Sequence, residues 1–127
     1  MHILMCNDDG ILADGLRHLA SYLSQYYRIT VVAPANEQSA KSHALTTEVP
    51  LKLDAYNGED ENPRLYALTG TPSDCMKFGL SYLLTDDMPD LVISGINHGF
   101  NLGSDVLYSG TVSAAMESCF YGIPGLA

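Results

Sequence analysis

The first ten residues constrain the fold more than any other stretch of this chain. Residues 3–6 read Ile-Leu-Met-Cys, an unbroken apolar run typical of a buried parallel strand, and the run stops at Asn-Asp-Asp-Gly. Asp8 and Asp9 are therefore adjacent carboxylates at the point where a strand ends. Such carboxylates repel one another beside a low-dielectric core, so both stay ionised only if a cation or strong hydrogen-bond donors compensate them.

The acidic pair has two interpretations. Carboxylate oxygens suit Mg²⁺, Mn²⁺ or Ca²⁺, and ligands of open α/β sheets bind at the carboxyl ends of the strands. The alternative is that Asn-Asp-Asp-Gly is a turn and helix-capping sequence without a ligand, because Asx residues and glycine suit turns. The pair alone does not separate the two.

The charge balance argues against one class of partner. The 127 residues contain 15 Asp and Glu against 6 Lys and Arg, giving a net charge of −9. Nucleic-acid polymers bind basic surfaces, so we expect no such partner. No Lys or Arg follows Lys77. A phosphate substrate would therefore be held through a metal ion or through backbone N–H groups.

Length and cysteine usage predict one domain in a reducing compartment. A chain of 127 residues with 46% hydrophobic residues can bury its own core. Cys6, Cys75 and Cys119 are too widely spaced for a zinc ribbon or a disulfide framework, and we expect buried thiols. The sequence shows no secretory signal pattern and no apolar run of membrane-spanning length. We therefore predict a cytoplasmic protein without a membrane partner.

The hydrophobic pattern predicts alternating strands and helices. We expect strands over 3–6, 29–33 and 91–93, and helices over 14–26 (with Asp14 as N-cap), 72–84 and 112–120. The last helix would pack through Ala114, Ala115, Met116 and Cys119. This order predicts an α/β fold, a mostly parallel sheet with helices on both faces. Residues 122–127 read as the turn into a fourth strand inside which the chain stops, so we expect the sheet to be truncated on its C-terminal side.

The middle of the chain is predicted to add little chemistry. Residues 49–53 and 66–68 form a weak hairpin pattern. Residues 54–64 between them are acidic and contain Asn-Gly and a proline, which predicts an exposed loop without catalytic residues. Gly-Thr-Pro-Ser-Asp at 70–74 is a helix start, in which Asp74 supports the first turn.

Polar residues follow three of the predicted strands. Asp8 and Asp9 follow the first, Ser39 lies in the polar segment after the second, and Asn97 follows the third. The carboxyl ends of parallel strands meet at one edge of a sheet, so we expect these side chains to lie close together. Their oxygens would form a hard, incomplete coordination shell with room for water and a substrate oxygen.

A second polar stretch leads into the last helix. Residues 101–111 are rich in Gly, Asn and Ser, and a helix start after them offers backbone donors and hydroxyls for a phosphate. Asn101, Ser109 and Thr111 are the candidate residues, although Ser109 and Thr111 equally suit helix capping. His98 is either a proton donor or an incidental loop histidine, and His43 reads as an ordinary one.

Motifs of competing enzyme classes are absent. The sequence has no G-x-S-x-G nucleophile elbow, no Walker A sequence and no H-E-x-x-H. Residues 95–103 are glycine-rich but lack the G-x-G-x-x-G spacing of a dinucleotide site.

Five blocks follow one another along the sequence: Asn-Asp-Asp-Gly at 7–10, Val-Val-Ala-Pro at 31–34 with Gln-Ser at 38–39, and the segments 70–75, 89–97 and 108–112. Together they resemble the SurE (survival protein E) family of metal-dependent nucleotidases, which act as phosphatases. The resemblance implies a Rossmann-like single domain over 1–127 and hydrolysis of nucleoside 5'- or 3'-monophosphates. It implies one divalent cation, Mg²⁺ or Mn²⁺, bound by Asp8, Asp9, Ser39 and Asn97, with the two aspartates also catalytic. The turn Ser109-Gly110-Thr111 would lie beside the substrate phosphate.

The sequence departs from this family in two residues and in length. Ala40 stands where the family usually has glycine, and Asp14 stands where it commonly has proline; neither is a predicted ligand. Family members are longer, and the C-terminal region through which they form homodimers or homotetramers is absent here. Two functions are therefore expected: an active nucleotidase, or a catalytically silent nucleotide- or metal-binding fragment.

Overall fold

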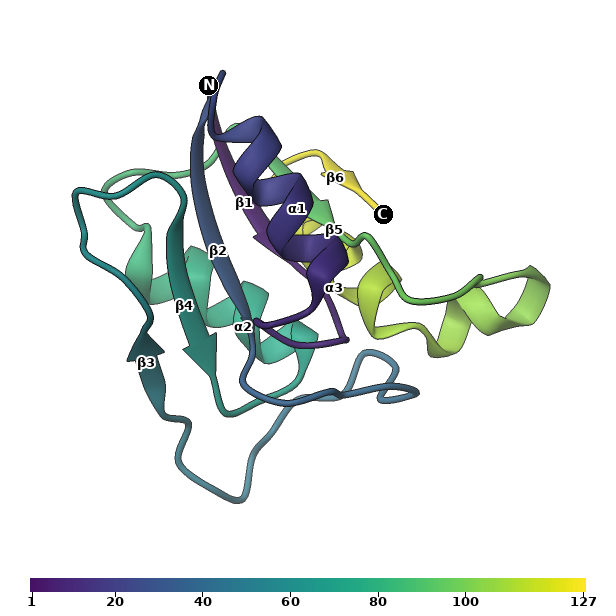
Figure 1. Ribbon diagram of the computed structural model, residues 1–127. Helices are drawn as coiled ribbons and strands as arrows, with labels where there is room; N and C mark the ends of the chain where they lie inside the picture. Colours follow the sequence, from purple (N-terminus) through teal and green to yellow (C-terminus); the bar gives the residue numbers. More distant parts are fainter.

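The computed structural model describes residues 1–127 as a six-stranded sheet covered by helices (Figure 1). The strands are β1 (His2–Cys6), β2 (Arg28–Pro34), β3 (Leu53–Ala55), β4 (Arg64–Leu68), β5 (Leu91–Ser94) and β6 (Gly125–Leu126). The α-helices are α1 (Asp14–Leu23), α2 (Pro72–Phe78) and α3 (Gly110–Cys119). A π-helical turn, η1 (Gly79–Leu83), continues α2, and a 3₁₀ segment, η2 (Gly103–Tyr108), precedes α3.

The sheet has the order β3-β4-β2-β1-β5-β6, and only β3 runs antiparallel to its neighbour. This confirms the predicted α/β class with a mostly parallel sheet. The chain builds outward from β1 through β2 to β4, and then returns to place β5 on the other side of β1. The gap between the carboxyl ends of β1 and β5 is therefore the topological switch point, where open α/β sheets bind ligands.

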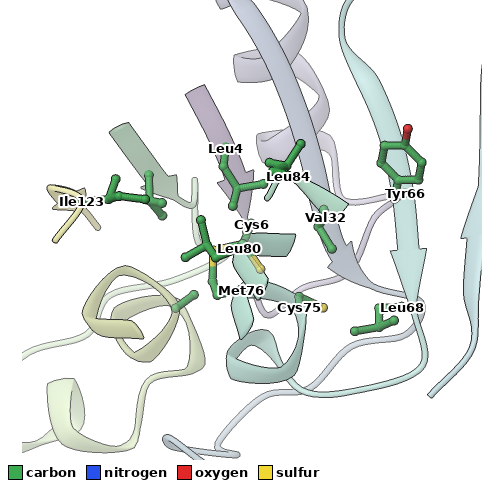
Figure 2. Packing of buried hydrophobic residues seen from close by; sticks show 12 residues of the cluster. Leu4, Cys6, Val32, Tyr66, Leu68, Cys75, Met76, Leu80, Leu84 and Ile123 are labelled. Carbon is green, nitrogen blue, oxygen red and sulfur yellow. The ribbon is translucent and has the colours of Figure 1, made fainter. Parts of the chain in front are cut away.

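Each face of the sheet has its own core because side chains alternate along β1. Ile3 and Met5 pack with Leu16 of α1 on one face. Leu4 and Cys6 pack on the other face with α2, η1 and α3, and Figure 2 shows Met76 and Leu80 beside them. Helices thus cover both faces, as predicted, and the four apolar residues of β1 are all buried.

The first two helix starts differ in how well the sequence predicted them. The N-cap of α1 is Ala13, without a side-chain cap, and Asp14 is the first helical residue, so the prediction of Asp14 as N-cap is wrong by one position. For α2 the prediction is confirmed. Thr71 and Asp74 form a reciprocal capping box, and Pro72 occupies the first turn.

The packing face of α3 was predicted wrongly in part. Ala114 and Ala115 are buried, but Met116 and Cys119 are exposed. The buried face is completed by small and polar residues, namely Ser113, Glu117 and Ser118 among others. The Ser113 hydroxyl donates to the carbonyl of Ser109, the N-cap, and the Ser118 hydroxyl donates to the carbonyl of Ala115. These bonds satisfy the two hydroxyls and allow them to be buried. Because the buried residues are polar, the hydrophobic pattern did not reveal this face. Of the three thiols predicted to be buried, only those of Cys6 and Cys75 are.

The first strand of the edge hairpin lies later in the chain than predicted, whereas the predicted second strand, 66–68, lies within β4. β3 begins at Leu53, the last residue of the predicted strand 49–53, and pairs antiparallel with β4. Residues 59–61 in the connecting loop are exposed. Asn62 ties the loop to the sheet: its Oδ1 accepts the N–H of Ile29 at 2.8 Å, and its Nδ2 donates to Tyr27 O at 2.9 Å. No helix combines the length and the apolar character needed to cross a bilayer.

Candidate functional site

The turn after β1 fixes the direction of the acidic pair. The fully buried Asn7 closes this turn: its Oδ1 accepts the Gly10 N–H at 3.1 Å, and its Nδ2 donates to Gly10 O at 3.2 Å. Gly10 has φ 101°, a conformation that L side chains rarely adopt. Asp8 and Asp9 are therefore held on a closed Asx-type turn at the switch point.

Each carboxylate is oriented by a group that is distant in sequence. Asp8, 6% exposed, accepts a hydrogen bond from the Thr111 hydroxyl, with 2.6 Å between Oγ1 and Oδ1. Asp9 Oδ2 accepts the backbone N–H of His98 at 2.9 Å. Both partners belong to segments that follow β5 in the chain. The orientation of the two carboxylates at the end of β1 therefore depends on residues from the other side of the switch point.

Asn97 is brought to the pair by the turn after β5. Gly95, with φ 131°, starts this turn, and its N–H donates to Cys6 O at 2.9 Å. The Asn97 Nδ2 donates to Gly99 O at 3.3 Å, and its Oδ1 lies 3.3 Å from the Thr111 Oγ1. The same hydroxyl contacts Asp8 and Asn97, so the side-chain oxygens of these two residues converge on Thr111.

Ser39 reaches the site on the long loop after β2. The loop is joined to the end of β1 because the Gln38 N–H donates to the Asp8 carbonyl at 2.7 Å. The Ser39 hydroxyl donates to Glu37 Oε1 at 2.6 Å. Glu37 thus supports a predicted ligand and places a third carboxylate beside the acid pair.

These side chains surround one cavity of about 390 Å³. Six of the predicted site residues line it: Asp8, Asp9, Ser39, Asn97, Asn101 and Ser109. Gly110 and Thr111 do not line it and lie behind it, against Asp8. Two further acidic residues, Glu37 and Asp105, line the cavity although no sequence motif predicted them there. The one signal for Glu37 was its place two residues before Ser39 in the loop.

The cavity is lined by more acidic than basic side chains, a charge that favours binding of a cation. Four carboxylates, those of Asp8, Asp9, Glu37 and Asp105, line it together with one histidine, His98, and no Lys or Arg. No group of three or more His, Cys, Asp or Glu side chains is arranged to hold a metal ion. A metal here would therefore need the amide oxygen of Asn97 and the hydroxyl of Ser39 beside the acid pair. This all-oxygen donor set fits Mg²⁺ or Mn²⁺ and does not fit Zn²⁺.

The start of α3 supplies hydrogen-bond donors close to the acidic residues. The Ser109 hydroxyl accepts the Val112 N–H at 3.2 Å and caps the helix, as one of the two sequence interpretations predicted. Gly110 and Thr111 are the first two helical residues, so their N–H groups have no acceptor within the helix. The Thr111 hydroxyl is already bonded to Asp8. The backbone, more than the hydroxyls, is thus available for an anion.

A larger cavity nearby shares Asn97 and Asn101 with the acidic cavity and includes Thr111, but it contains none of the acidic residues. It has a volume of about 560 Å³ and lies between the start of α3 and the outer side of β5. Its lining is mostly apolar, contributed by residues such as Ile93, Phe100 and Leu126, and it includes no carboxylate side chain. The carboxylates are therefore confined to the smaller of these two cavities.

Comparison with known proteins gives a consistent result over the whole chain. The family model described as Survival protein SurE matches residues 3–127. A 5'-nucleotidase SurE from Thermoanaerobacter sp. (strain X514) is 54% identical over 127 residues, which are 100% of this chain and 50% of that protein. One from Vibrio vulnificus (strain YJ016) is 50% identical over 100% of this chain and 48% of its own. The chain spans about half the length of the curated relatives it matches.

The fold has a counterpart among solved structures. The crystal structure of SurE protein from Aquifex aeolicus superimposes with a TM-score of 0.85 and is 43% identical. The match covers 98% of this chain and 48% of the Aquifex chain. The similarity in structure therefore extends over the same half-length as the similarity in sequence.

Proposed function

Because the chain belongs to the SurE family, we propose that it hydrolyses nucleoside 5'-monophosphates, and 3'-monophosphates at the same centre, to nucleoside and phosphate. The reaction would depend on one divalent cation. The observation that carries this proposal is the convergence of Asp8, Asp9, Ser39 and Asn97 on one acidic cavity. The relatives bear the name 5'-nucleotidase, and the chain matches them in the half that contains these residues.

The four converging residues would hold the cation through oxygen. Asp8 and Asp9 contribute the charge, and Ser39 and Asn97 contribute neutral oxygens. Bound there, Mg²⁺ or Mn²⁺ supplies Lewis acidity, which polarises a phosphoryl oxygen and makes water a stronger acid. The Thr111 hydroxyl keeps the Asp8 carboxylate in place, and the His98 N–H does the same for Asp9.

The phosphate would bind across the start of α3. Ser109, the N-cap of α3, lines the cavity, and the partial positive charge at a helix N-terminus favours an anion there. Asn101 and Ser109 line the cavity and would add side-chain donors. This arrangement replaces the Lys and Arg side chains that the cavity lacks.

The chain's own residues also account for the protons. A water oxygen forms the new bond to phosphorus in line with the ester oxygen, and one of the two aspartates accepts the proton that the water loses. The P–O ester bond then breaks, and the leaving ribose oxygen takes up a proton. His98, the one histidine that lines the cavity, is our candidate for donating it.

The test is phosphate release from a panel of nucleoside monophosphates with Mn²⁺, with Mg²⁺ and with EDTA. We expect metal-dependent release that is lost in Asp8→Asn and in Asp9→Asn. Asp60→Asn, the same change in the exposed loop 59–61, is the matched control and should keep wild-type turnover. Unchanged turnover in both site variants would refute the mechanism.

The second candidate function is a catalytically silent metal- or nucleotide-binding module. One observation favours it: the chain matches only about half the length of its relatives, which are 5'-nucleotidases at full length. Mn²⁺ binding by calorimetry without phosphate release would support this module. The assembly of relatives into homodimers or homotetramers stays an expectation from the sequence.

A further inference from the structure

The loop after β2 carries Ser39, yet residues 36–46 contain no helix or strand. Two of its residues adopt a left-handed backbone although neither is glycine: Ala40 has φ 57° and Ser42 has φ 53°. Such conformations cost free energy and persist only where surrounding contacts impose them. The position of Ser39 therefore depends on what holds this loop.

One set of contacts joins the loop to the segment before α3. The Ser42 N–H donates to Tyr108 O at 3.1 Å, and the Ser42 hydroxyl donates to Leu107 O at 3.0 Å. Two residues later in the loop, the carbonyl of Ala44 accepts a hydrogen bond from the hydroxyl of Thr71, the N-cap of α2, at 2.6 Å. These bonds lie on either side of residue 43.

The loop is also joined to α3 by an ion-pair-type hydrogen bond. His43 Nε2 lies 2.6 Å from Glu117 Oε2, a carboxylate on the buried face of α3. The Glu117 side chain is 8% exposed and the His43 side chain 31% exposed. The His43 ring also packs against Phe120, with 6.2 Å between ring centroids.

This pair has no other evident role. Glu117 and His43 do not line the acidic cavity, so neither touches the proposed cation or substrate. A buried carboxylate is costly unless a donor compensates it, and His43 is the side chain that donates to Glu117. The cost of burying Glu117 is thus offset only when the loop is docked on α3.

We propose that His43 and Glu117 are positioning residues: their hydrogen bond docks the loop 36–46 on α3 and thereby fixes Ser39 as a ligand beside the acid pair. The inference rests on the proposed metal site. α3 then serves the site at both ends, since its first turn lies against Asp8 and its last turn carries Glu117.

The test compares Mn²⁺ affinity by calorimetry with amide exchange of the loop. His43→Ala should raise the Mn²⁺ Kd roughly tenfold, as is typical when a group supporting a metal ligand is lost, and should speed exchange of the Ser42 N–H. His43→Gln, whose amide can still donate to Glu117, should restore most of the affinity. His18→Ala, the same change at an exposed histidine on α1, is the control.

A double variant separates docking from general stability. If the two residues act as one unit, Glu117→Gln in the His43→Ala background should add less to the Kd than it does alone. A loss of melting temperature in His43→Ala with unchanged Mn²⁺ Kd would mean a purely structural pair and would overturn the inference. So would unchanged exchange of the Ser42 N–H.

The two proposals fail in distinguishable ways. If the wild-type chain binds no Mn²⁺, the proposed metal site is refuted. The docking of the loop is then judged by amide exchange alone: faster exchange of Ser42 in His43→Ala, but not in His18→Ala, supports it, and equal exchange overturns it.

Discussion

The hydroxyl of Thr111 lies 2.6 Å from the Oδ1 of Asp8, joining the first turn of α3 to the end of β1. The same hydroxyl is 3.3 Å from Asn97 Oδ1, at the end of β5. One side chain thus connects the two strands of the switch point with the helix whose N-terminus faces the proposed phosphate.

Replacing Thr111 by valine should destabilise the fold. Valine keeps the shape of threonine but leaves the buried Asp8 carboxylate without its donor, and a hydrogen bond to a charged group contributes about 1.5–3 kcal/mol. We expect the free energy of unfolding, measured with urea, to fall by about that amount. Thr111→Ser keeps the hydroxyl and is the control. If Thr111→Val is as stable as wild type, the bond to Asp8 is not stabilising.

Adding a side chain at Gly110 should destabilise the fold. A Cβ at this position would lie 2.8 Å from the Cβ of Asp8 and 3.0 Å from Cγ of Pro72. Gly110→Ala should therefore cost about 1–3 kcal/mol of stability and lower phosphate release, because Asp8 must move. In Gly58→Ala the new Cβ has no neighbour closer than 3.8 Å, and stability should change by no more than about 0.5 kcal/mol. Equal effects of the two variants in urea unfolding would contradict this prediction.

Replacing Ala40 by glycine should stabilise the fold. Its φ of 57° disfavours a Cβ, and relieving this conformation should stabilise the fold by about 0.5–1 kcal/mol despite the greater freedom of glycine in the unfolded chain. Ala44→Gly, in the same loop but without a positive φ, should destabilise by a similar amount. Thermal unfolding of the two variants should thus give shifts of opposite sign. A loss of stability in Ala40→Gly would show that the loop conformation is not strained.

The stability of the fold should fall in mild acid because of His2. Burial, and then the nearby charge of Arg28, lower the pKa of His2 below its ordinary value of 6.5. The ring lies 2.9 Å from the Thr30 hydroxyl and is 2% exposed. The unfolded chain takes up the proton first as the pH drops below about 6.5, so stability is complete above that pH and declines toward the lower folded pKa.

His2→Gln should remove this part of the pH dependence. We expect a smaller loss of unfolding free energy between pH 7.5 and pH 5.5 than in the wild type. His18→Gln, at an exposed position, should keep the wild-type slope. Parallel slopes for the wild type and His2→Gln would show that folding does not change the pKa of His2.

The fold was predictable where hydrophobicity and burial coincide. The run Ile-Leu-Met-Cys became β1 because every residue of a strand covered on both faces is buried. Hydrophobicity does not indicate the buried face of α3, where the buried residues Ser113, Glu117 and Ser118 are polar and the apolar Met116 is exposed. Helices packed through small and polar residues carry no amphipathic pattern, so their orientation comes only from tertiary contacts.

The candidate site was predictable for residues that directly follow a strand, because the end of the strand determines their position. Asp8, Asp9 and Asn97 follow strands that pair with each other, so their convergence follows from parallel topology alone. Glu37 and the partnership of His43 with Glu117 were missed. The loop that carries Glu37 and His43 has no periodicity, and its course depends on contacts with residues as far away in sequence as Glu117.

The strand order also has a consequence for synthesis. The Asp8 carboxylate leaves the ribosome 103 residues before the hydroxyl that will hold it. At about 5–20 residues per second, the acidic turn spends roughly 5–20 seconds without its partner. Of the two strands that flank β1 in the sheet, β2 is synthesised before β5, so β1 can pair only with β2 until β5 has been made. The hydrogen bond that orients Asp8 can therefore form only once the first turn of α3 has been synthesised.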